Sequence, residues 1–317
     1  MDQKRTKTAF APTLPPGLEK LLDDYKQHCR RNGLRESTIE QYEKECRWFL
    51  HNLAECDCTN VSQITASRVV TACLALKSPS YLPTVQTFLR YCTDSEETDR
   101  DYSYVIPPYK RPQPIPSVYS EEEIRRMETA IDRSNPVGKR DYAIVLLATR
   151  LGLRLEDIRT LSFDELDFTK DTIHLVQEKT LAQLELPMVS ELKNALLEYI
   201  QNVRPDVDGC IFQISYPPYG RMSKSGIIAC FRRALHKSGI IRNNRGLGPR
   251  AFRSSLASSM VNDGVPYEVV RKTLGYIDPN AISHYARLDI ERLRFYALPV
   301  PEATGAFADF LKGRSAR

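Results

Sequence analysis

The first strong hydrophobic pattern in the chain has the period of an α-helix. Leu18, Leu22 and Tyr25 follow Pro16 at spacings of three to four residues, which places them on one helical face. Three more helical segments follow: one that starts at the capping-box sequence STIE, then ITASRVVTACLAL, then YLPTVQTFLRYC. The pattern predicts a helical unit over residues 16–106, preceded by a flexible N-terminal arm over residues 1–15.

A proline-rich segment follows this helical unit. The sequence PPYKRPQPIPSVYS, residues 107–120, holds five prolines in fourteen positions. Prolines at this density favour extended, semi-rigid chain and exclude a continuous helix. We therefore predict an interdomain linker over residues 107–118, and a new helix that starts at the capping box of Ser120 and Glu123.

The second unit, predicted over residues 119–300, mixes helices with a pair of short strands. The segment DTIHLVQEKTLAQLELPM is apolar on both sides of a polar centre, which predicts a β-hairpin that turns at residues 178–182. Helical patterns dominate elsewhere, so the fold class is mainly α with a small β-hairpin or sheet (α+β). In the tail, residues 301–317, an apolar face of Phe307, Phe310 and Leu311 lies on a helix too short to be stable alone, so it needs a docking surface.

Composition narrows the class of protein. The chain has 317 residues, of which 42% are hydrophobic and 27% charged, as in a globular protein. We find no apolar run of membrane-spanning length and no apolar signal core, and therefore expect a cytoplasmic protein without membrane contact. The eight cysteines form no C-x-x-C pair, so neither a disulfide framework nor a metal site is expected.

The charges are unevenly distributed, although the net charge is only +5. No Asp or Glu occurs from Gly209 to Asn262, a segment that we call the acid-free stretch. A solvated protein surface normally mixes both signs, so this pattern favours binding of a polyanion such as DNA. The basic residues of the stretch are Arg221, Lys224, Arg232, Arg233, Lys237, Arg242, Arg245, Arg250 and Arg253.

Four short segments carry the candidate chemistry. They are LGLRLEDIRTL with Arg154, QEKTLAQLELPM with Lys179, GPRAFRSSLASSM with Arg250 and Arg253, and LGYIDPNAISHYARL with Tyr276 and Tyr285. In this order and spacing they resemble the catalytic domain of the tyrosine recombinases, the phage-integrase and Xer-like family. By the same resemblance, residues 16–106 correspond to that family's core-binding domain, and the two domains would clamp duplex DNA.

The residue types suit phosphodiester cleavage. A phosphorane-like transition state gains negative charge, and the guanidiniums of Arg154 and Arg253 can neutralise it bidentately without losing a proton. Lys179, on a hairpin, can protonate the leaving 5′-oxygen. Tyr285 would attack as a phenolate, and because a phenol has a pKa near about 10, neighbouring cations must favour its ionised form. The resemblance implies a 3′-phosphotyrosyl intermediate.

Two positions depart from the family pattern. The family has His-x-x-Arg where this chain has Arg250, and His or Trp after Leu-Gly where it has Tyr276. A guanidinium cannot accept a proton, so Arg250 is expected to hold the phosphate and lower the Tyr285 pKa. The Tyr276 phenol can donate to a non-bridging oxygen, with simple packing an equal alternative. His284 is a candidate base, although adjacent side chains on a helix diverge.

The resemblance also implies partners. We expect double-stranded DNA with paired recombination sites, a homo-tetramer on that DNA, and a tail that docks in trans on a neighbouring copy. An accessory recombinase or a directionality factor is a further candidate partner, and neither a metal nor a nucleotide cofactor is expected. Two alternatives stay open: a catalytically weak or inactive DNA-binding partner of an active recombinase, and strand relaxation like that of a type IB topoisomerase.

Overall fold

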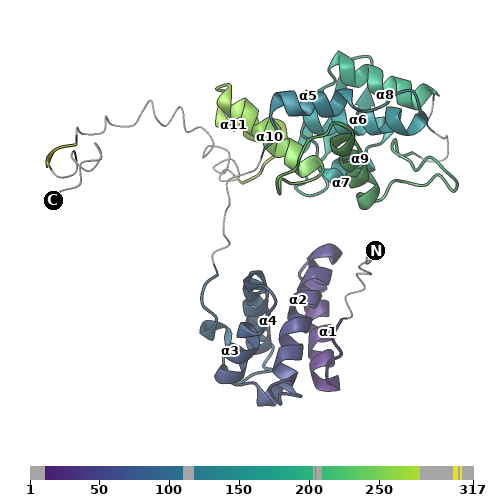
Figure 1. The fold of residues 1–317 in the computed structure, drawn as a ribbon. Coiled ribbons are helices and arrows are strands. Elements are labelled where there is room, and N and C mark those ends of the chain that lie inside the picture. Colours follow the sequence, from purple (N-terminus) through teal and green to yellow (C-terminus); the bar gives the residue numbers. More distant parts are fainter. Residues whose placement is uncertain are drawn as a thin grey trace, which may run out of the picture. The chain divides into compact units, whose positions relative to one another are not determined.

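The computed structural model describes residues 11–109, 118–202, 204, 209–278, 303–305 and 308. The chain divides into two compact units, residues 1–112 and 113–317, and the boundary falls inside the proline-rich segment (Figure 1). Both units are built mainly from helices, and the second also holds one small sheet. The predicted fold class, mainly α with a small sheet, is confirmed.

The first unit packs four helices around aromatic side chains. The residues predicted to share a face of the first helix, Leu18, Leu22 and Tyr25, are buried, and the Tyr25 ring lies 5.1 Å from that of Phe88, edge to face. The sequence STIE does not cap the second helix as predicted, because that helix begins one residue before Ser37 and has no side-chain cap. The elements are α1 (Pro16–Arg31), α2 (Glu36–Ala54), η1 (Val61–Gln63), α3 (Ala66–Leu74), η2 (Pro79–Tyr81), α4 (Leu82–Asp94) and η3 (Ser103–Val105).

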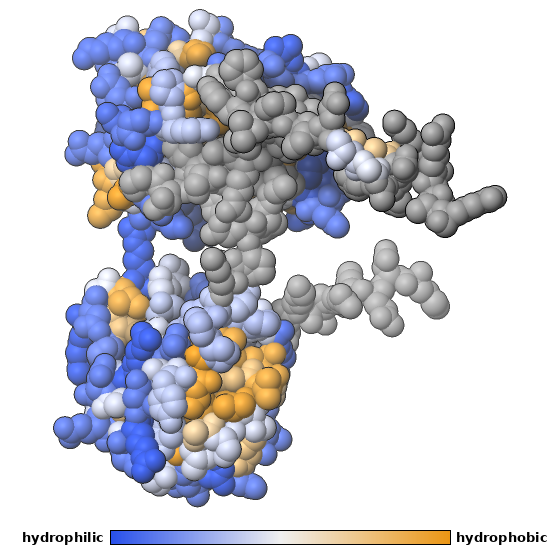
Figure 2. Space-filling view, turned by 90° about the vertical axis from the view of Figure 1, so that its left-hand side faces the viewer, coloured by the Kyte–Doolittle hydropathy of each residue, from blue (hydrophilic) through white to orange (hydrophobic). Residues whose placement is uncertain are grey.

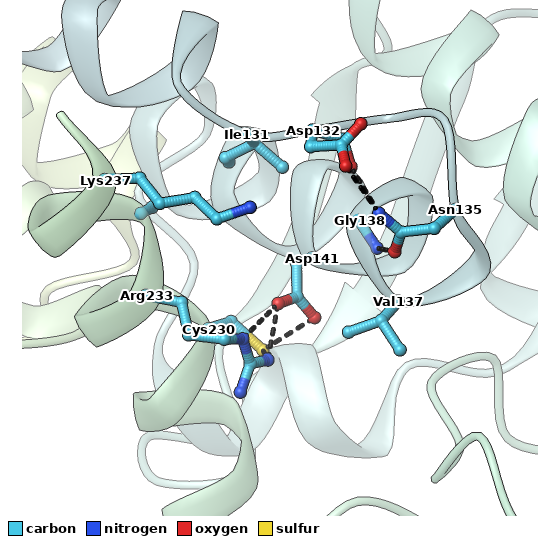
Figure 3. Close-up of a pocket in the computed structure, with 10 residues that line it drawn as sticks. Ile131, Asp132, Asn135, Val137, Gly138, Asp141, Cys230, Arg233 and Lys237 are labelled. Carbon is cyan, nitrogen blue, oxygen red and sulfur yellow. Dashed lines mark hydrogen bonds and ion pairs between the residues drawn. The ribbon is translucent and has the colours of Figure 1, made fainter.

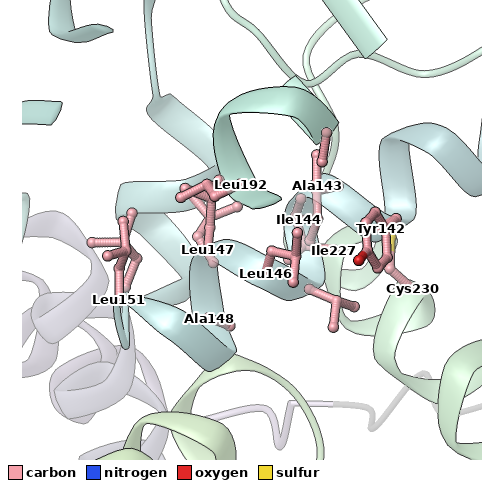
Figure 4. Packing of buried hydrophobic residues seen from close by; sticks show 14 of the residues in the cluster. Tyr142, Ala143, Ile144, Leu146, Leu147, Ala148, Leu151, Leu192, Ile227 and Cys230 are labelled. Carbon is pink, nitrogen blue, oxygen red and sulfur yellow. The ribbon is translucent and has the colours of Figure 1, made fainter. Parts of the chain in front are cut away.

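The second unit surrounds one buried helix, α6. Every residue from Ala143 to Ala148 on this helix is completely buried, against Leu192 on α8 and Ile227 on α9 among others (Figure 4). An all-apolar surface of this kind is typical of a helix covered on every side. The elements are α5 (Glu121–Thr129), α6 (Pro136–Arg150), α7 (Leu155–Thr160), η4 (Phe163–Glu165), β1 (Leu166–Asp167), β2 (Thr172–Val176), β3 (Gln183–Pro187), α8 (Ser190–Asn202), α9 (Lys224–Lys237), α10 (Pro249–Asn262) and α11 (Tyr267–Leu274).

The sheet is antiparallel, in the order β1-β2-β3. The predicted hairpin is β2 and β3, paired from Thr172 opposite Pro187 to Val176 opposite Gln183, and the short strand β1 extends it. Side chains alternate between core and solvent: Ile173 is buried and Val176 is 55% exposed. The loop between the strands is largely exposed, with Glu178, Lys179 and Leu181 at the surface.

The first described residues of the second unit are Val118, Tyr119 and Ser120, which we call the entry clamp, and Tyr119 attaches them to α10. Ser120 caps α5 through the predicted capping box. The Tyr119 backbone N–H donates to Ser255 Oγ at 2.9 Å, and its hydroxyl donates to the carbonyl of Gly246 at 2.9 Å. The Tyr119 ring also stacks on that of Phe252, with 4.9 Å between the centroids. The start of this unit is thus held by both hydrogen bonds and packing.

Hydrophilic residues cover most of the visible surface of the second unit, whereas apolar residues gather on the visible face of the first (Figure 2). Val70, Leu74 and Tyr104 are the large apolar side chains of the first unit that remain more than one third exposed among the described residues. Within the described ranges, we find no helix with the length and hydrophobicity that a membrane span requires.

Candidate active site

Three of the predicted site residues meet in the second unit, although they come from distant parts of the chain. Arg253 on α10 donates from Nε to the hydroxyl oxygen of Tyr276 at 3.0 Å. The guanidinium carbons of Arg253 and Arg154 lie 4.4 Å and 5.7 Å from the centroid of the Tyr276 ring. Both separations are within the range of a cation–π interaction. The structure therefore brings together Arg154, Arg253 and Tyr276.

A glycine turn places Arg154 at this point. Gly152 follows α6 with φ of +62°, a left-handed conformation that ends the helix and lets α7 start directly after Arg154. A Cβ atom at residue 152 would stand only 2.8 Å from Leu274 Cδ2, so the site also requires a residue without a side chain. The Gly152 carbonyl accepts a hydrogen bond from Arg253 Nη1 at 2.8 Å. One backbone turn therefore orients both arginines.

The C-terminal end of α11 supplies the other acceptors. The last carbonyls of a helix lack intrahelical partners and carry partial negative charge, which suits cationic donors. Here the Leu274 carbonyl accepts from Arg253 Nη2, and the Gly275 carbonyl accepts from Arg154 Nη2 at 3.3 Å. Tyr276 follows directly. We call this end of α11, Leu274 to Tyr276, the arginine-bound turn.

Asp157, three residues after Arg154, connects α7 to the hairpin. Its carboxylate is buried, and Oδ1 accepts a hydrogen bond from the backbone N–H of Glu178 at 3.0 Å. Burial raises the pKa of Asp157, while the Glu178 N–H and the charge of Arg154 act in the opposite direction. Its second oxygen, Oδ2, is buried without a hydrogen-bond partner in the part of the chain that the structure describes.

Gln177 belongs to the site but was not predicted. Its side chain is completely buried at the end of β2. Its Oε1 accepts from Arg154 Nη1, and its Nε2 donates to the Leu274 carbonyl at 3.2 Å. The alternation of the strand contained a signal, because Ile173 and Leu175 face the core and residue 177 is next on that face. A polar residue predicted to be buried must find hydrogen-bond partners.

Two predicted residues lie at the surface. Lys179 is exposed on the loop of the hairpin, and Arg250 is exposed at the start of α10. Among the described residues, neither side chain makes a hydrogen bond or ion pair with Arg154, Arg253 or Tyr276. The predicted nucleophile Tyr285, its neighbour His284, and the tail residues Phe307, Phe310 and Leu311 lie outside the described residues.

Three cations of the acid-free stretch are paired with carboxylates from other segments. Arg233 on α9 donates from Nε to Asp141 Oδ2 at 2.9 Å, beside a cavity of about 70 Å³ that Cys230 and Lys237 also line (Figure 3). Arg245 binds both carboxylate oxygens of Glu123, at 2.6 and 2.7 Å, and holds the pKa of that carboxyl below its usual value. Lys224 lies 3.4 Å from a carboxylate oxygen of Glu156.

The other predicted DNA contacts are solvent-exposed. Arg221, Arg232, Lys237 and Arg242 are exposed, and within the described ranges we find no carboxylate in ion-pair contact with them. Arg242 donates from Nε to the carbonyl of Arg245 at 3.1 Å, which orders its side chain without neutralising it. No cluster of His, Cys, Asp or Glu among the described residues could hold a metal ion.

The comparisons with known proteins identify the family of the chain. The family model described as the phage integrase family matches residues 117–292, more than half of the chain. The chain therefore belongs to the phage integrase family, the tyrosine-type site-specific recombinases that act on DNA. The integrase/recombinase-like protein y4rA of Sinorhizobium fredii (strain NBRC 101917 / NGR234) is 27% identical over 301 residues, which cover 90% of this chain and 72% of the relative.

Solved structures share the fold. The XerH site-specific recombinase bound to palindromic difH substrate, a post-cleavage complex, matches with a TM-score of 0.68 at 15% identity, over 87% of this chain and 82% of that one. A lambda integrase tetramer bound to a Holliday junction matches with a TM-score of 0.66 at 14% identity, over 84% of this chain and 76% of the other. At these identities the likeness shows the fold.

Proposed function

We propose that this recombinase cuts a DNA strand by attack of the Tyr285 phenolate on a phosphodiester. A bond forms between the tyrosine oxygen and phosphorus, the bond from phosphorus to the 5′-oxygen breaks, and a 3′-phosphotyrosyl link remains. The 5′-hydroxyl of a second strand then reverses the step, so the bond energy is conserved. The observation that carries the proposal is the meeting of Arg154 and Arg253 at the arginine-bound turn, which ends nine residues before Tyr285.

The two arginines are suited to bind the reacting phosphate. Their guanidiniums are oriented by carbonyl, amide and hydroxyl oxygens, which fix position without cancelling charge. Positively charged donors that are fixed before the reaction stabilise the extra negative charge of the transition state. They would also favour the ionised form of Tyr285. Tyr276 accepts the Arg253 hydrogen bond on its hydroxyl oxygen, and a phenol can also donate; we infer that it donates to a non-bridging oxygen once DNA is bound.

Lys179 and Arg250 would complete the site once DNA is bound. Lys179 projects on the hairpin loop, and we infer that it reaches the scissile phosphate and gives a proton to the leaving 5′-oxygen. Arg250 lies three residues before Arg253 on α10 and is exposed at its start. We infer that its guanidinium binds the phosphate as a charge stabiliser, because it cannot act as a base.

Partners follow from the same proposal. Exposed Arg221, Arg232, Lys237 and Arg242 would contact the DNA backbone, with Lys224, Arg233 and Arg245 contributing less because carboxylates accompany them. We infer a homo-tetramer on paired double-stranded sites in the cytoplasm, with residues 301–317 docked on a neighbouring copy. Residues 16–106 would form the core-binding domain, joined by the linker 107–118 to a catalytic domain over 119–300.

A nicked duplex that traps the covalent intermediate tests the chemistry. The wild type should form a protein–DNA adduct, and peptide mapping should find the DNA on Tyr285. Tyr285→Phe removes only the hydroxyl, so DNA binding should persist while the adduct disappears. An adduct on Tyr276, or one that persists in Tyr285→Phe, would refute the assignment of the nucleophile.

The same substrates separate the alternatives. Specific binding without any adduct in the wild type would identify a DNA-binding partner of an active recombinase. Relaxation of supercoiled DNA without exchange between paired sites would identify an activity like that of a type IB topoisomerase. The two departures at Arg250 and Tyr276 make the first alternative worth testing directly.

A further inference from the structure

The loop that carries Lys179 is closed at its base by a single residue, Gln177. The backbone N–H of Gln177 donates to the carbonyl of Ala182 at 2.9 Å, and its carbonyl accepts from the N–H of Leu181 at 2.8 Å. Its side-chain Oε1 also accepts from the hydroxyl of Thr180 at 2.8 Å. Gln177 therefore closes the base of the loop that carries Lys179, and the bond from Glu178 N–H to Asp157 attaches the same loop to α7.

The same side chain binds the two other parts of the site. Besides Thr180, its Oε1 accepts from Arg154 Nη1, and its Nε2 donates to the Leu274 carbonyl. Gly275 lies directly against the amide: a Cβ atom there would stand 2.5 Å from Gln177 Oε1. The amide is thus enclosed by the hairpin, by Arg154 and by the arginine-bound turn, in a completely buried position.

The chemistry of an amide suits this position. Glutamine offers an acceptor to Arg154 and Thr180 and a donor to Leu274 on one rigid plane, whereas a carboxylate has no donor and an aliphatic side chain has neither. A carboxylate would also offset the charge of Arg154, whereas the neutral amide orients the guanidinium without offsetting its charge. A buried polar group that lost these partners would carry a desolvation cost.

We propose that Gln177 is a positioning residue that sets the place of the Lys179 loop relative to Arg154 and the arginine-bound turn. This inference rests on the proposed function, in which Lys179 protonates the 5′-oxygen while Arg154 holds a non-bridging oxygen of the same phosphate. Two groups that act on one phosphate must be placed together, and an error of about 1 Å in such a site costs roughly 10²-fold in rate.

The experiment compares Gln177→Leu with the matched control Gln183→Leu. Gln183 is an exposed residue on the partner strand of the same hairpin, opposite Val176, so its change tests a Gln-to-Leu substitution without the amide contacts. Single-turnover adduct formation on the nicked duplex should be roughly 10²-fold slower for Gln177→Leu and unchanged for Gln183→Leu. Melting temperature and DNA affinity are measured for each protein in parallel.

A sulfur substrate distinguishes positioning from simple damage. In a 5′-bridging phosphorothiolate the leaving group departs as a thiolate, which needs no proton, so the contribution of Lys179 is bypassed. The defect of Gln177→Leu should shrink by about tenfold or more on this substrate, as should that of Lys179→Ala. A variant that is merely misfolded would be equally slow on both substrates. An equal loss on both, or a wild-type rate on the oxygen substrate, would overturn the proposal.

A second variant covers the case in which Gln177→Leu does not fold. Thr180→Val keeps the shape of the side chain and removes only the hydroxyl that binds Gln177. Its adduct formation should slow by about fivefold, with recovery on the sulfur substrate. No loss, or loss without recovery, would contradict the proposal. If the wild type itself forms no adduct, the proposed function fails. If the wild type forms the adduct and the variants form it at the same rate, only the positioning role fails.

Discussion

Two groups of arginines have different kinds of hydrogen-bond partner. The first group binds the arginine-bound turn, and the second lies on α9 and in the loop that follows it. Arg154 and Arg253 donate to backbone carbonyls, an amide oxygen and a phenol oxygen. Arg233 and Arg245 donate to the carboxylates of Asp141 and Glu123. Both groups are well ordered by hydrogen bonds, but among the described residues only the second donates to carboxylates.

This difference separates charge that holds the fold together from charge that can bind an anion. A carboxylate at ion-pair distance neutralises the guanidinium, whereas a carbonyl fixes its position and leaves the charge in place. Counting basic residues along the sequence therefore overstates the electrostatic contribution of the acid-free stretch. The arginine-bound turn should dominate the chemistry, and the exposed cations Arg232 and Lys237 should dominate the salt dependence of binding.

The largest effect is expected from Arg253. Arg253→Ala should slow adduct formation on the nicked duplex by roughly 10³-fold, because a transition-state donor is lost. Arg253→Lys keeps the charge but cannot make the three hydrogen bonds to Tyr276, Gly152 and Leu274, so it should be nearly as slow. DNA affinity should change little in both. A wild-type rate for the lysine variant would mean that charge alone, without the geometry of the turn, is sufficient.

Arg250 tests whether an exposed arginine on α10, three residues before Arg253, also stabilises the transition state. Arg250→Ala should slow adduct formation by about 10²-fold, as the loss of one stabilising donor does. Arg250→His should retain cleavage, because histidine is the residue that the family resemblance places there. The measurement is the single-turnover rate for both variants, with melting temperature as the control. An alanine variant as active as the wild type would remove Arg250 from the site.

The smallest effect concerns DNA binding alone. It compares two exposed cations on α9, Arg232 and Lys237, with Arg233 on the same helix, which is paired with a carboxylate. Neutralising Arg232 and Lys237 to Gln should reduce the slope of log K against log salt by about two, since each phosphate contact contributes about 0.9. Arg233→Gln, in which the lost charge was already paired with Asp141, should leave the slope close to that of the wild type. Binding to a duplex is measured at several salt concentrations.

The control for this experiment is stability. Arg233→Gln leaves the buried carboxylate of Asp141 with its remaining partners, Arg140 and Cys230, and should lower the melting temperature. The Arg232 and Lys237 variants should not. A reduced slope for Arg233→Gln, equal to that of the exposed pair, would show that ion pairing within the protein does not determine which cations meet DNA.

The sequence predicted secondary-structure elements but not which distant side chains would form ion pairs. The hairpin and the helix start at Ser120 follow local rules, and both are confirmed in the structure. The partners of Arg233 and Arg245 lie 92 and 122 residues away in the chain, so no local pattern could reveal them. The acid-free stretch looks uncompensated in sequence because the carboxylates that pair with its cations are on α5, α6 and α7.

The candidate active site also contains both residues that the sequence predicted and one that it did not. Arg154, Arg253 and Tyr276 were predicted from motifs that carry the family resemblance, and the structure brings them together, whereas their catalytic roles stay predictions. Gln177 was not predicted because its side-chain amide is neither charged nor nucleophilic. Its strand position, on the inward face after Leu175, was the physical signal.

The entry clamp has a mechanical consequence. Tyr119 is bound to Ser255 and Phe252 on α10 and to Gly246 just before that helix, so a pull on Val118 would be transmitted to α10. Phe252 and Ser255 flank Arg253 on that helix. Tension in the connector would therefore arrive within one helical turn of the buried guanidinium. The stacked rings of Tyr119 and Phe252 would bear part of that load.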